Sequence, residues 1–262
     1  MGFVKTPDEI ARIERALSAP SWSGELLSIQ FLTDPATVER LLPPPLEPAP
    51  QPLAAITVGR WQSNCLGDFA GGTLSLTARH DGVDGTYALV IFMDSEPPLA
   101  FGRELFGEAK KLARSGLFRH ADHVHGWIDR NGERLVDIRA DLHTDLGPTE
   151  MSRHTFNFKA RTAAGGVGLE EDAILTRARF DMTVRSRREG TGTIVLGSTV
   201  HDPLDDIEVR EIQRAVFQQD HSAVSCKRVA TVPAEQFLPY HHGHADDWLA
   251  LDTAPPARAG AA

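Results

Sequence analysis

The sequence predicts an α+β fold that is mostly β, in which one curved antiparallel sheet closes on itself and carries helices at its periphery. Apolar and polar residues alternate along several runs, most clearly over residues 174–184, which buries one face of such a strand. The dipeptide Asn131-Gly132 separates two strand-like runs, and it is the strongest short-range signal for a β-hairpin. Helix signals are few and short, and the sequence has no repeat period.

Length and composition fit a single globular domain with a sizeable core. The chain has 262 residues, of which 41% are hydrophobic and 24% charged. We therefore expect one domain over residues 1–252 and a disordered, Pro/Ala-rich tail over residues 253–262. Cys65 and Cys226 form no CxxC motif, so we expect two reduced, buried thiols.

Charge and hydropathy limit the partners of the protein. The net charge is −9 at pH 7, which disfavours a nucleic acid or an anionic membrane as partner. The sequence has no apolar run long enough to span a membrane and no signal-peptide pattern over residues 1–20. We therefore expect a cytoplasmic protein.

The first fifth of the chain carries two helix signals around one strand. Residues 6–9, Thr-Pro-Asp-Glu, predict a helix start with a threonine N-cap and a glutamate capping-box partner, and Pro20 ends that helix. A strand is predicted over residues 25–32, and a second helix begins at Asp34-Pro35. Six prolines over residues 43–52 predict an extended, irregular segment.

The rest of the chain is predicted to be strands joined by turns. A helical turn is expected over residues 99–106, ended by Gly107, and a last helix over residues 233–240. Glycines at residues 190–192 predict a turn. The predicted strands are 53–60, 73–80, 86–93, 123–130, 133–143, 154–160, 174–184, 193–200 and 223–232.

Two adjacent lysines, Lys110 and Lys111, stand out in a chain that otherwise prefers arginine. The chain has five lysines against 22 arginines. Arginine keeps its proton near neutral pH, whereas lysine can lose it when it is buried or lies beside another cation. Only the neutral amine can attack a carbonyl carbon and form a Schiff base. The pair therefore marks a candidate nucleophile, and the alternative is a solvated basic dipeptide on a loop.

The segment over residues 93–113, MDSEPPLAFGRELFGEAKKLA, resembles the signature of the acetoacetate decarboxylase family. That signature runs D-x-E-P, then G-R-E-L, then a lysine pair, and the resemblance covers roughly residues 15–245. It implies a cone-like antiparallel β-barrel, a homo-oligomer, and a Schiff base at Lys110 with Lys111 as its neighbour. The decarboxylase lysine is itself a known example of an amine activated in this way.

Three positions depart from the decarboxylase pattern. By the resemblance, Gly24 stands where the decarboxylase has an arginine, and Ile56 and Gly71 stand where it has glutamates. In the decarboxylase, those three polar groups interact with the carboxylate of the β-keto acid substrate. Arg60 or Asp68 is a candidate substitute for the missing groups.

The resemblance leaves more than one activity open. Some members of the family keep the lysine and act as aldolase-dehydratases, which condense pyruvate with an aldehyde and then eliminate water. A protonated imine accepts electrons from a leaving CO₂ or from a departing α-proton, so one lysine supports both reactions. Because the carboxylate-handling groups are missing, we favour aldol condensation and dehydration. The alternatives are a β-keto acid decarboxylase and a non-catalytic binder of small molecules.

Further residues complete the predicted site. Tyr240 is assigned to catalysis because a tyrosine near the C-terminus can transfer protons in the aldolase-like branch; the alternative is a packing tyrosine. Glu104 is also assigned to catalysis, with a structural pair to Arg103 as the alternative, and Glu108 is a candidate base beside Lys110. The residues predicted to bind the substrate are Tyr87, Phe92, Arg60 and Phe106.

Two groups of histidines have no spacing known for structural zinc. They are His120, His123 and His125, and His241, His242 and His244. We expect neither a metal nor another cofactor, because Schiff-base chemistry needs none. The expected partner is a small carbonyl substrate.

Overall fold

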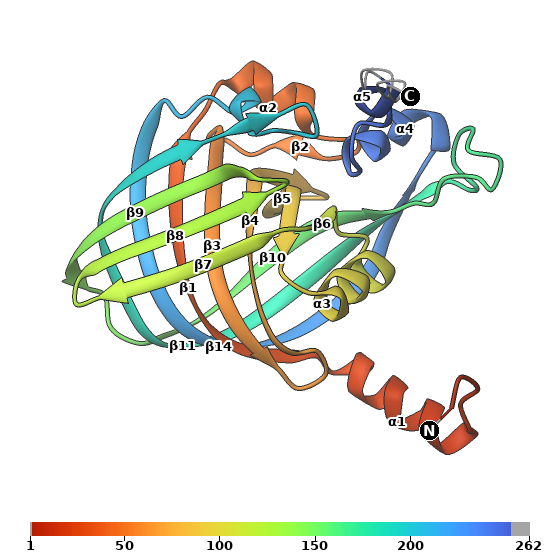
Figure 1. Ribbon diagram of the computed structural model, residues 1–262, viewed down its shortest axis with the longest axis horizontal. Helices are drawn as coiled ribbons and strands as arrows, with labels where there is room; N and C mark the ends of the chain where they lie inside the picture. The colour runs from red at the N-terminus through yellow and green to blue at the C-terminus, as the bar shows by residue number, and fades with distance from the viewer. Residues whose placement is uncertain (1, 253–262) are drawn as a thin grey trace, which may run out of the picture.

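The structure is a computed structural model that describes residues 2–252, so the predicted tail over residues 253–262 lies outside the described residues (Figure 1). Within that range, seven strands close a barrel in the order β10-β5-β4-β3-β1-β14-β11, and β11 pairs again with β10. The barrel strands are β1 (Ser21–Leu32), β3 (Leu53–Ser63), β4 (Gly67–His80), β5 (Val83–Met93), β10 (Thr149–Lys159), β11 (Ala173–Leu196) and β14 (Glu211–Val232). The predicted barrel of the α+β class is confirmed.

The barrel is mixed rather than wholly antiparallel. Strand β10 pairs in parallel with β5 through Thr155 and Phe156, which oppose Thr86 and Tyr87. A short strand, β6 (Lys110–Leu112), also pairs in parallel with β5. Every other pairing around the barrel is antiparallel among the described strands.

A second sheet continues from β11 and lies over β1, β3 and β4 (Figure 1). Its strands are β7 (Arg114–His120), β8 (His123–Arg130) and β9 (Glu133–Asp145), and the predicted Asn131-Gly132 hairpin joins the last two. The main core fills the space between this sheet and the outer face of the barrel, and it includes Leu27, Ile56, Leu74 and Ile138. Because side chains alternate along a strand, the other face of the same barrel strands lines the interior.

The predicted turn over residues 190–192 is wrong, because β11 runs through it without a break. The glycines there serve a close approach between strands. A Cβ at Gly190 would collide with the backbone of Asp141, and the register between β9 and β11 shifts beside it. The strand thereby bends from the barrel into the second sheet.

The helices lie at the ends of the barrel. The capping box of α1 (Pro7–Ser18) is confirmed, but its apolar stripe is exposed, with Ile10 at 44% and Ile13 at 43% of their surface. Figure 1 shows α1 projecting from the barrel. The other helices are α2 (Pro35–Leu41), α3 (Glu96–Phe101), the π-helical turn η1 (Gly102–Phe106), the 3₁₀ turn η2 (Leu204–Asp206), α4 (Ala234–Gly243) and α5 (Trp248–Asp252).

Some features escaped the sequence prediction. Strand β7 carries no clear alternation, since Leu117 and Phe118 are adjacent apolar residues in a polar segment. The short strands β2 (Glu47–Pro48), β12 (Ser198–Thr199) and β13 (Asp202–Pro203) were also not predicted. Both cysteines are free, as expected, but each is half-buried rather than buried.

Candidate active site

The two adjacent lysines point to opposite faces of β6. Lys110 lines a cavity of about 130 Å³ inside the barrel, which we name the Lys110 cavity. Lys111 lines a different cavity of about 210 Å³ on the side of the main core, which we name the Lys111 cavity. Side-chain alternation along a strand produces this separation. The two amines are therefore neighbours in sequence but do not share a cavity.

The amine of Lys110 has two close oxygen partners. Its Nζ donates to the carbonyl oxygen of Pro98 at 2.8 Å and lies 2.9 Å from Oε2 of Glu108. The side chains of Lys110 and Glu108 are 9% and 10% exposed. If either side chain were removed, the other would be a buried charge with little contact to water. Each charge is therefore stabilised by the other.

Two glycines of the signature make room for this pair. A Cβ at Gly102, in η1, would collide with the Glu108 carboxylate and with the end of the Lys110 side chain. Gly107 has a φ of 78°, and a Cβ there would also meet the backbone of Phe158. A left-handed glycine thus ends η1 and turns the chain so that Glu108 and Lys110 return beneath α3.

The wall of the Lys110 cavity combines apolar rings with hydroxyl groups. Among its lining residues, Glu108 is the one carboxylate, and Lys110 and Arg153 are the cations. A nucleophile, an acid or base and a second cation therefore face one cavity. Other lining residues include Leu26, Ile91, Phe101, Phe106, Phe180, Thr57, Thr73, Ser75, Thr86 and Asn157.

Arg153 supplies a guanidinium without an ion-pair partner. It lies on β10 opposite Phe180 of β11, and its guanidinium carbon is 4.7 Å from the centre of the Phe180 ring. The side chain is accessible to water but surrounded by protein, as expected for a group that lines a cavity, and burial lowers its pKa. Asp220 and Glu108 are the acids that oppose this shift. No carboxylate of the described residues lies within 4.0 Å of it, so its donors are available to an anion.

Trp61 occupies the region where the decarboxylase arginine was expected. Its ring packs against Gly24 and Gly59, and a Cβ at either glycine would collide with it. The ring also stacks on Phe69, with centroids 5.5 Å apart. Gly71 has no room for a larger side chain either, because a Cβ there would meet the backbone carbonyl of Phe92.

Position 56 lies outside the Lys110 cavity. Ile56 points into the main core and is fully buried there, so it does not face the Lys110 cavity. Its neighbour Thr57 faces the cavity instead and donates a hydrogen bond to Ser28 Oγ at 3.0 Å. Neither residue is a carboxylate, so this part of β3 brings no acidic group to the Lys110 cavity.

The remaining predicted residues are dispersed. Phe106 joins Lys110, whereas Tyr87 and Tyr240 line the Lys111 cavity. Phe92 is buried in the main core. Glu104 is exposed and lines an open cleft that also includes His241 and His242.

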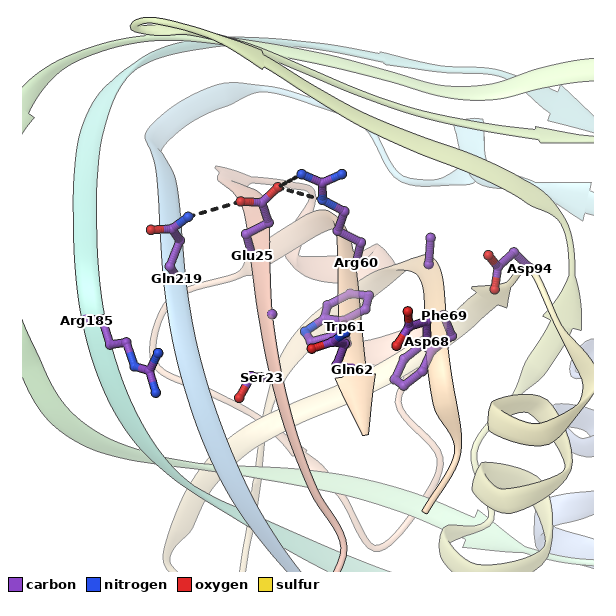
Figure 2. Close-up of a pocket in the computed structure, with 12 residues that line it drawn as sticks. Ser23, Glu25, Arg60, Trp61, Gln62, Asp68, Phe69, Asp94, Arg185 and Gln219 are labelled. Carbon is purple, nitrogen blue, oxygen red and sulfur yellow. Dashed lines mark hydrogen bonds and ion pairs between the residues drawn. The ribbon is translucent and has the colours of Figure 1, made fainter. Parts of the chain in front are cut away.

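Arg60 lies in an open polar groove of about 610 Å³. Figure 2 shows its guanidinium turned toward Glu25, which also accepts a hydrogen bond from Gln219. Arg60 Nε donates to Oε1 of Glu25 at 2.6 Å. This pairing neutralises Arg60 on the face of β3 opposite to Thr57, away from Lys110. Asp68 lines the same groove, so neither candidate substitute faces the Lys110 cavity.

Sequence reasoning missed Arg153, although a signal was present. In β10 the apolar Phe156 and Phe158 alternate with Arg153, Thr155 and Asn157. The apolar residues lie in the main core. The polar set marks the strand face that lines the barrel interior.

Two histidines of the first predicted group pair with carboxylates, whereas in the second group the rings of His241 and His242 contact each other. His123 pairs with Asp141, and His125 Nε2 lies 2.9 Å from Oδ2 of Asp137. The described residues contain no group of three or more His, Cys, Asp or Glu side chains with the geometry of a metal site.

Comparison with known proteins identifies the family. The family model of acetoacetate decarboxylase (ADC) matches residues 5–230. The chain belongs to the acetoacetate decarboxylase family. It is 29% identical over 195 residues to the acetoacetate decarboxylase of Acidiphilium cryptum, a match that covers 73% of this chain and 80% of the relative.

Solved structures share the barrel. The acetoacetate decarboxylase of Legionella pneumophila matches with a TM-score of 0.73 and 23% identity, over 82% of this chain and 88% of that one. The enduracididine biosynthesis enzyme MppR, solved with the condensation product of pyruvate and imidazole 4-carboxaldehyde, matches with a TM-score of 0.72 and 16% identity, over 80% and 88% of the two chains. Family membership indicates a lyase. None of the described helices is long and apolar enough to cross a membrane.

Proposed function

We propose that the protein is a carbon–carbon lyase in which Lys110 forms a Schiff base with a small keto acid and Glu108 transfers the protons. The observation that carries this proposal is the buried contact of 2.9 Å between the Lys110 amine and Glu108, the one carboxylate among the described residues that line its cavity. Tyr240 and Lys111 line the other cavity, and Glu104 is exposed, so proton transfer is assigned to Glu108.

The first steps need only these two residues. One proton passes from the Lys110 ammonium to Glu108, and the neutral amine attacks the carbonyl carbon of the substrate. Glu108 then returns the proton to the hydroxyl of the carbinolamine, which leaves as water. The product is a protonated imine, which draws electrons away from the neighbouring carbon.

Arg153 is the proposed anchor for the substrate carboxylate. Its guanidinium stacks on Phe180 at 4.7 Å, and a planar guanidinium binds a carboxylate through two parallel hydrogen bonds. The hydroxyl of Thr57 and the amide of Asn157 also line the cavity and add hydrogen-bonding groups. The proposed substrate is therefore a keto acid small enough for a cavity of about 130 Å³.

Aldol condensation followed by dehydration fits this set of groups better than decarboxylation. Glu108 removes an α-proton from the imine, the resulting enamine attacks an aldehyde, and Glu108 gives that proton to the new alkoxide. Glu108 then removes a second α-proton and delivers it to the hydroxyl, which leaves as water, and a further water hydrolyses the imine and frees Lys110. An ion pair with Arg153 stabilises a carboxylate more than neutral CO₂, so it favours chemistry that retains the carboxylate. The departures at Gly24 and Gly71 support the same choice, and Thr57, which faces the cavity beside Ile56, adds no carboxylate.

Decarboxylation of a β-keto acid is the second candidate. The family model and the 29% identity to a protein named acetoacetate decarboxylase favour it. Both activities share the Schiff base at Lys110 and differ in whether CO₂ leaves. A pocket that binds without covalent chemistry is the third possibility.

Borohydride trapping tests the proposal. The protein is incubated with pyruvate or with acetoacetate, reduced, and examined by intact mass and peptide mapping. We expect an adduct on Lys110 that is absent from Lys110→Ala and present in the control Lys227→Ala, whose lysine is exposed on β14. Trapping of pyruvate without CO₂ release from acetoacetate supports the aldolase-dehydratase, and CO₂ release supports the decarboxylase. Absence of an adduct with both ketones would contradict the proposal.

We also propose that residues 1–252 form one domain that assembles into a homo-oligomer in the cytoplasm. The exposed apolar residues of the N-terminal segment support assembly, because apolar surface of this kind is normally covered. They are Phe3, Val4, Ile10 and Ile13. A solution mass equal to that of one chain would exclude the oligomer.

A further inference from the structure

The Lys111 cavity gathers chemistry that the proposed reaction does not use. The chain has only two tyrosines, and both Tyr87 and Tyr240 line this cavity of about 210 Å³. It lies on the opposite face of β5 and β6 from Lys110. Its apolar wall comes from α2, β4, β5 and the η2 segment, through Leu41, Leu74, Leu89, Val90, Leu204 and Ile207.

One polar corner of the cavity is the pair of Tyr87 and His244. The Tyr87 hydroxyl and Nε2 of His244 share a hydrogen bond of 2.9 Å. Burial lowers the pKa of His244 to about 3 and raises that of Tyr87, so both groups are neutral at physiological pH. A hydroxyl forms more than one hydrogen bond, so that of Tyr87 can also bind a ligand.

The second polar group is the hydroxyl of Tyr240. Its ring stacks on Phe237 with centroids 6.3 Å apart, which holds the side chain in place. Within residues 2–252, this hydroxyl has no hydrogen-bond partner. The hydroxyl also lies near enough to Tyr87 to influence its pKa. A donor without a partner beside an apolar wall matches a ligand oxygen.

The charges around the cavity balance one another. Lys111 Nζ donates to His201 O at 2.6 Å and to Asp202 Oδ1 at 2.9 Å. Arg130 donates to Asp202 and, at 2.6 Å, to Asp246. Asp206 also lines the cavity, and its carboxylate lies 3.6 Å from the guanidinium of Arg40. Three cations thus meet three carboxylates. A charged ligand would enter without a counter-charge, at a large cost in desolvation.

We propose that the Lys111 cavity is a second ligand site, which binds a neutral alcohol or phenol of about the size of one ring. The ligand hydroxyl bonds to Tyr87 and Tyr240, and its apolar part packs against the leucines of the wall. A cavity of roughly 150 Å³ holds benzene in other proteins, so about 210 Å³ accommodates a ring with a hydroxyl group. This site does not depend on Schiff-base chemistry at Lys110.

Titration calorimetry of the Lys110→Ala protein with phenol tests the site. Because the nucleophile is absent, failure of the proposed Schiff base cannot alter the result. We expect one phenol per chain, roughly three- to tenfold weaker binding in Tyr240→Phe through loss of one hydrogen bond, and no binding in Leu89→Trp, which fills the cavity. Benzoate, which carries a charge, should bind at least tenfold more weakly than phenol.

A matched variant separates the two cavities. Thr73→Val changes the wall of the Lys110 cavity only, and we expect it to leave phenol binding unchanged. Thermal unfolding verifies that each variant is folded. The assignment would be overturned if the folded parent protein did not bind phenol. It would also be overturned if Tyr240→Phe and Leu89→Trp bound phenol as tightly as the parent, or if Thr73→Val lost binding.

Discussion

Lys110 and Lys111 are adjacent in sequence but occupy two different chemical environments. Lys110 has one carboxylate partner, Glu108, inside a cavity rich in hydroxyl groups. Lys111 is held by Asp202 and Asp246, which it shares with Arg130. A single acid can exchange a proton with an amine, whereas a balanced network of four charges fixes it. The comparison supports the proposal that Lys110 reacts with the substrate and predicts a structural role for Lys111.

The largest effect after loss of Lys110 is expected from its acid partner. Glu108→Gln keeps the size of the side chain but cannot carry a proton, so we expect turnover to fall by about 10²- to 10⁴-fold. Steady-state kinetics with pyruvate and an aldehyde, across a range of pH, measures the loss. Glu104→Gln, in the same segment but exposed, is the control and should stay within about twofold. Equal losses in both variants would argue against the role of Glu108.

Removal of Lys111 should affect stability rather than chemistry. Lys111→Met leaves Asp202 and Asp246 with Arg130 alone, which costs about 3–5 kcal/mol in the free energy of unfolding. Urea denaturation measures this cost, and Lys227→Met at an exposed position should lie within about 0.5 kcal/mol of the parent. The folded fraction should still trap a ketone on Lys110. Loss of trapping in folded Lys111→Met would reverse the comparison between the two lysines.

Arg153 should control recognition of the substrate carboxylate. Arg153→Gln removes a charged hydrogen-bonding group, and we expect the KM for pyruvate to rise by roughly 10- to 100-fold. Borohydride trapping of acetone, which has no carboxylate, should be unchanged. Arg179→Gln is a suitable control, because Arg179 pairs with Asp181 at an exposed position of β11. A similar loss with acetone and pyruvate would show that Arg153 acts on the fold instead.

The smallest effect is a pH dependence from the Lys111 cavity. Burial lowers the pKa of His244 from 6.5 to about 3, so the unfolded chain binds a proton that the folded chain does not. The resulting stability is fully present above about pH 6.5 and is lost as the pH falls toward 3. The slope is at most about 1.4 kcal/mol per pH unit, and solvent that reaches the half-buried ring reduces it. His244→Gln should flatten this slope in urea titrations between pH 4 and 7, and an unchanged slope would exclude His244 as its source.

The residues that the sequence identified were those with a local signature. The capping box at Thr6, the hairpin at Asn131 and the lysine segment each lie within a few residues, and the structure contains all three features. The grouping of side chains around a cavity depends instead on which residues of a strand share a face and on which of the two faces lies inside the barrel. That is why Tyr87 was assigned to the Lys110 site although it lies with Lys111.

Sheet closure also explains the residues that were missed. Arg153 and Lys110 come from different strands, and they meet only because β10 joins β5 on one side and β11 on the other. The space taken by Trp61 depends on Gly24 of β1 and Gly59 of β3. No short window of sequence contains these relations.

The length of β11 has a consequence for how the chain folds. Its 24 residues pair with β14 and β10 in the barrel and then with β9 in the second sheet. Several of these pairings join residues that are far apart in sequence, such as Ala173 with Val232 and Leu196 with Val136, and loop-closure entropy opposes them until both ends are ordered. We therefore expect slow, strongly cooperative folding in which neither sheet is stable alone. A fragment cut at Gly190 should aggregate through its unpaired strand edges instead of forming half of the molecule.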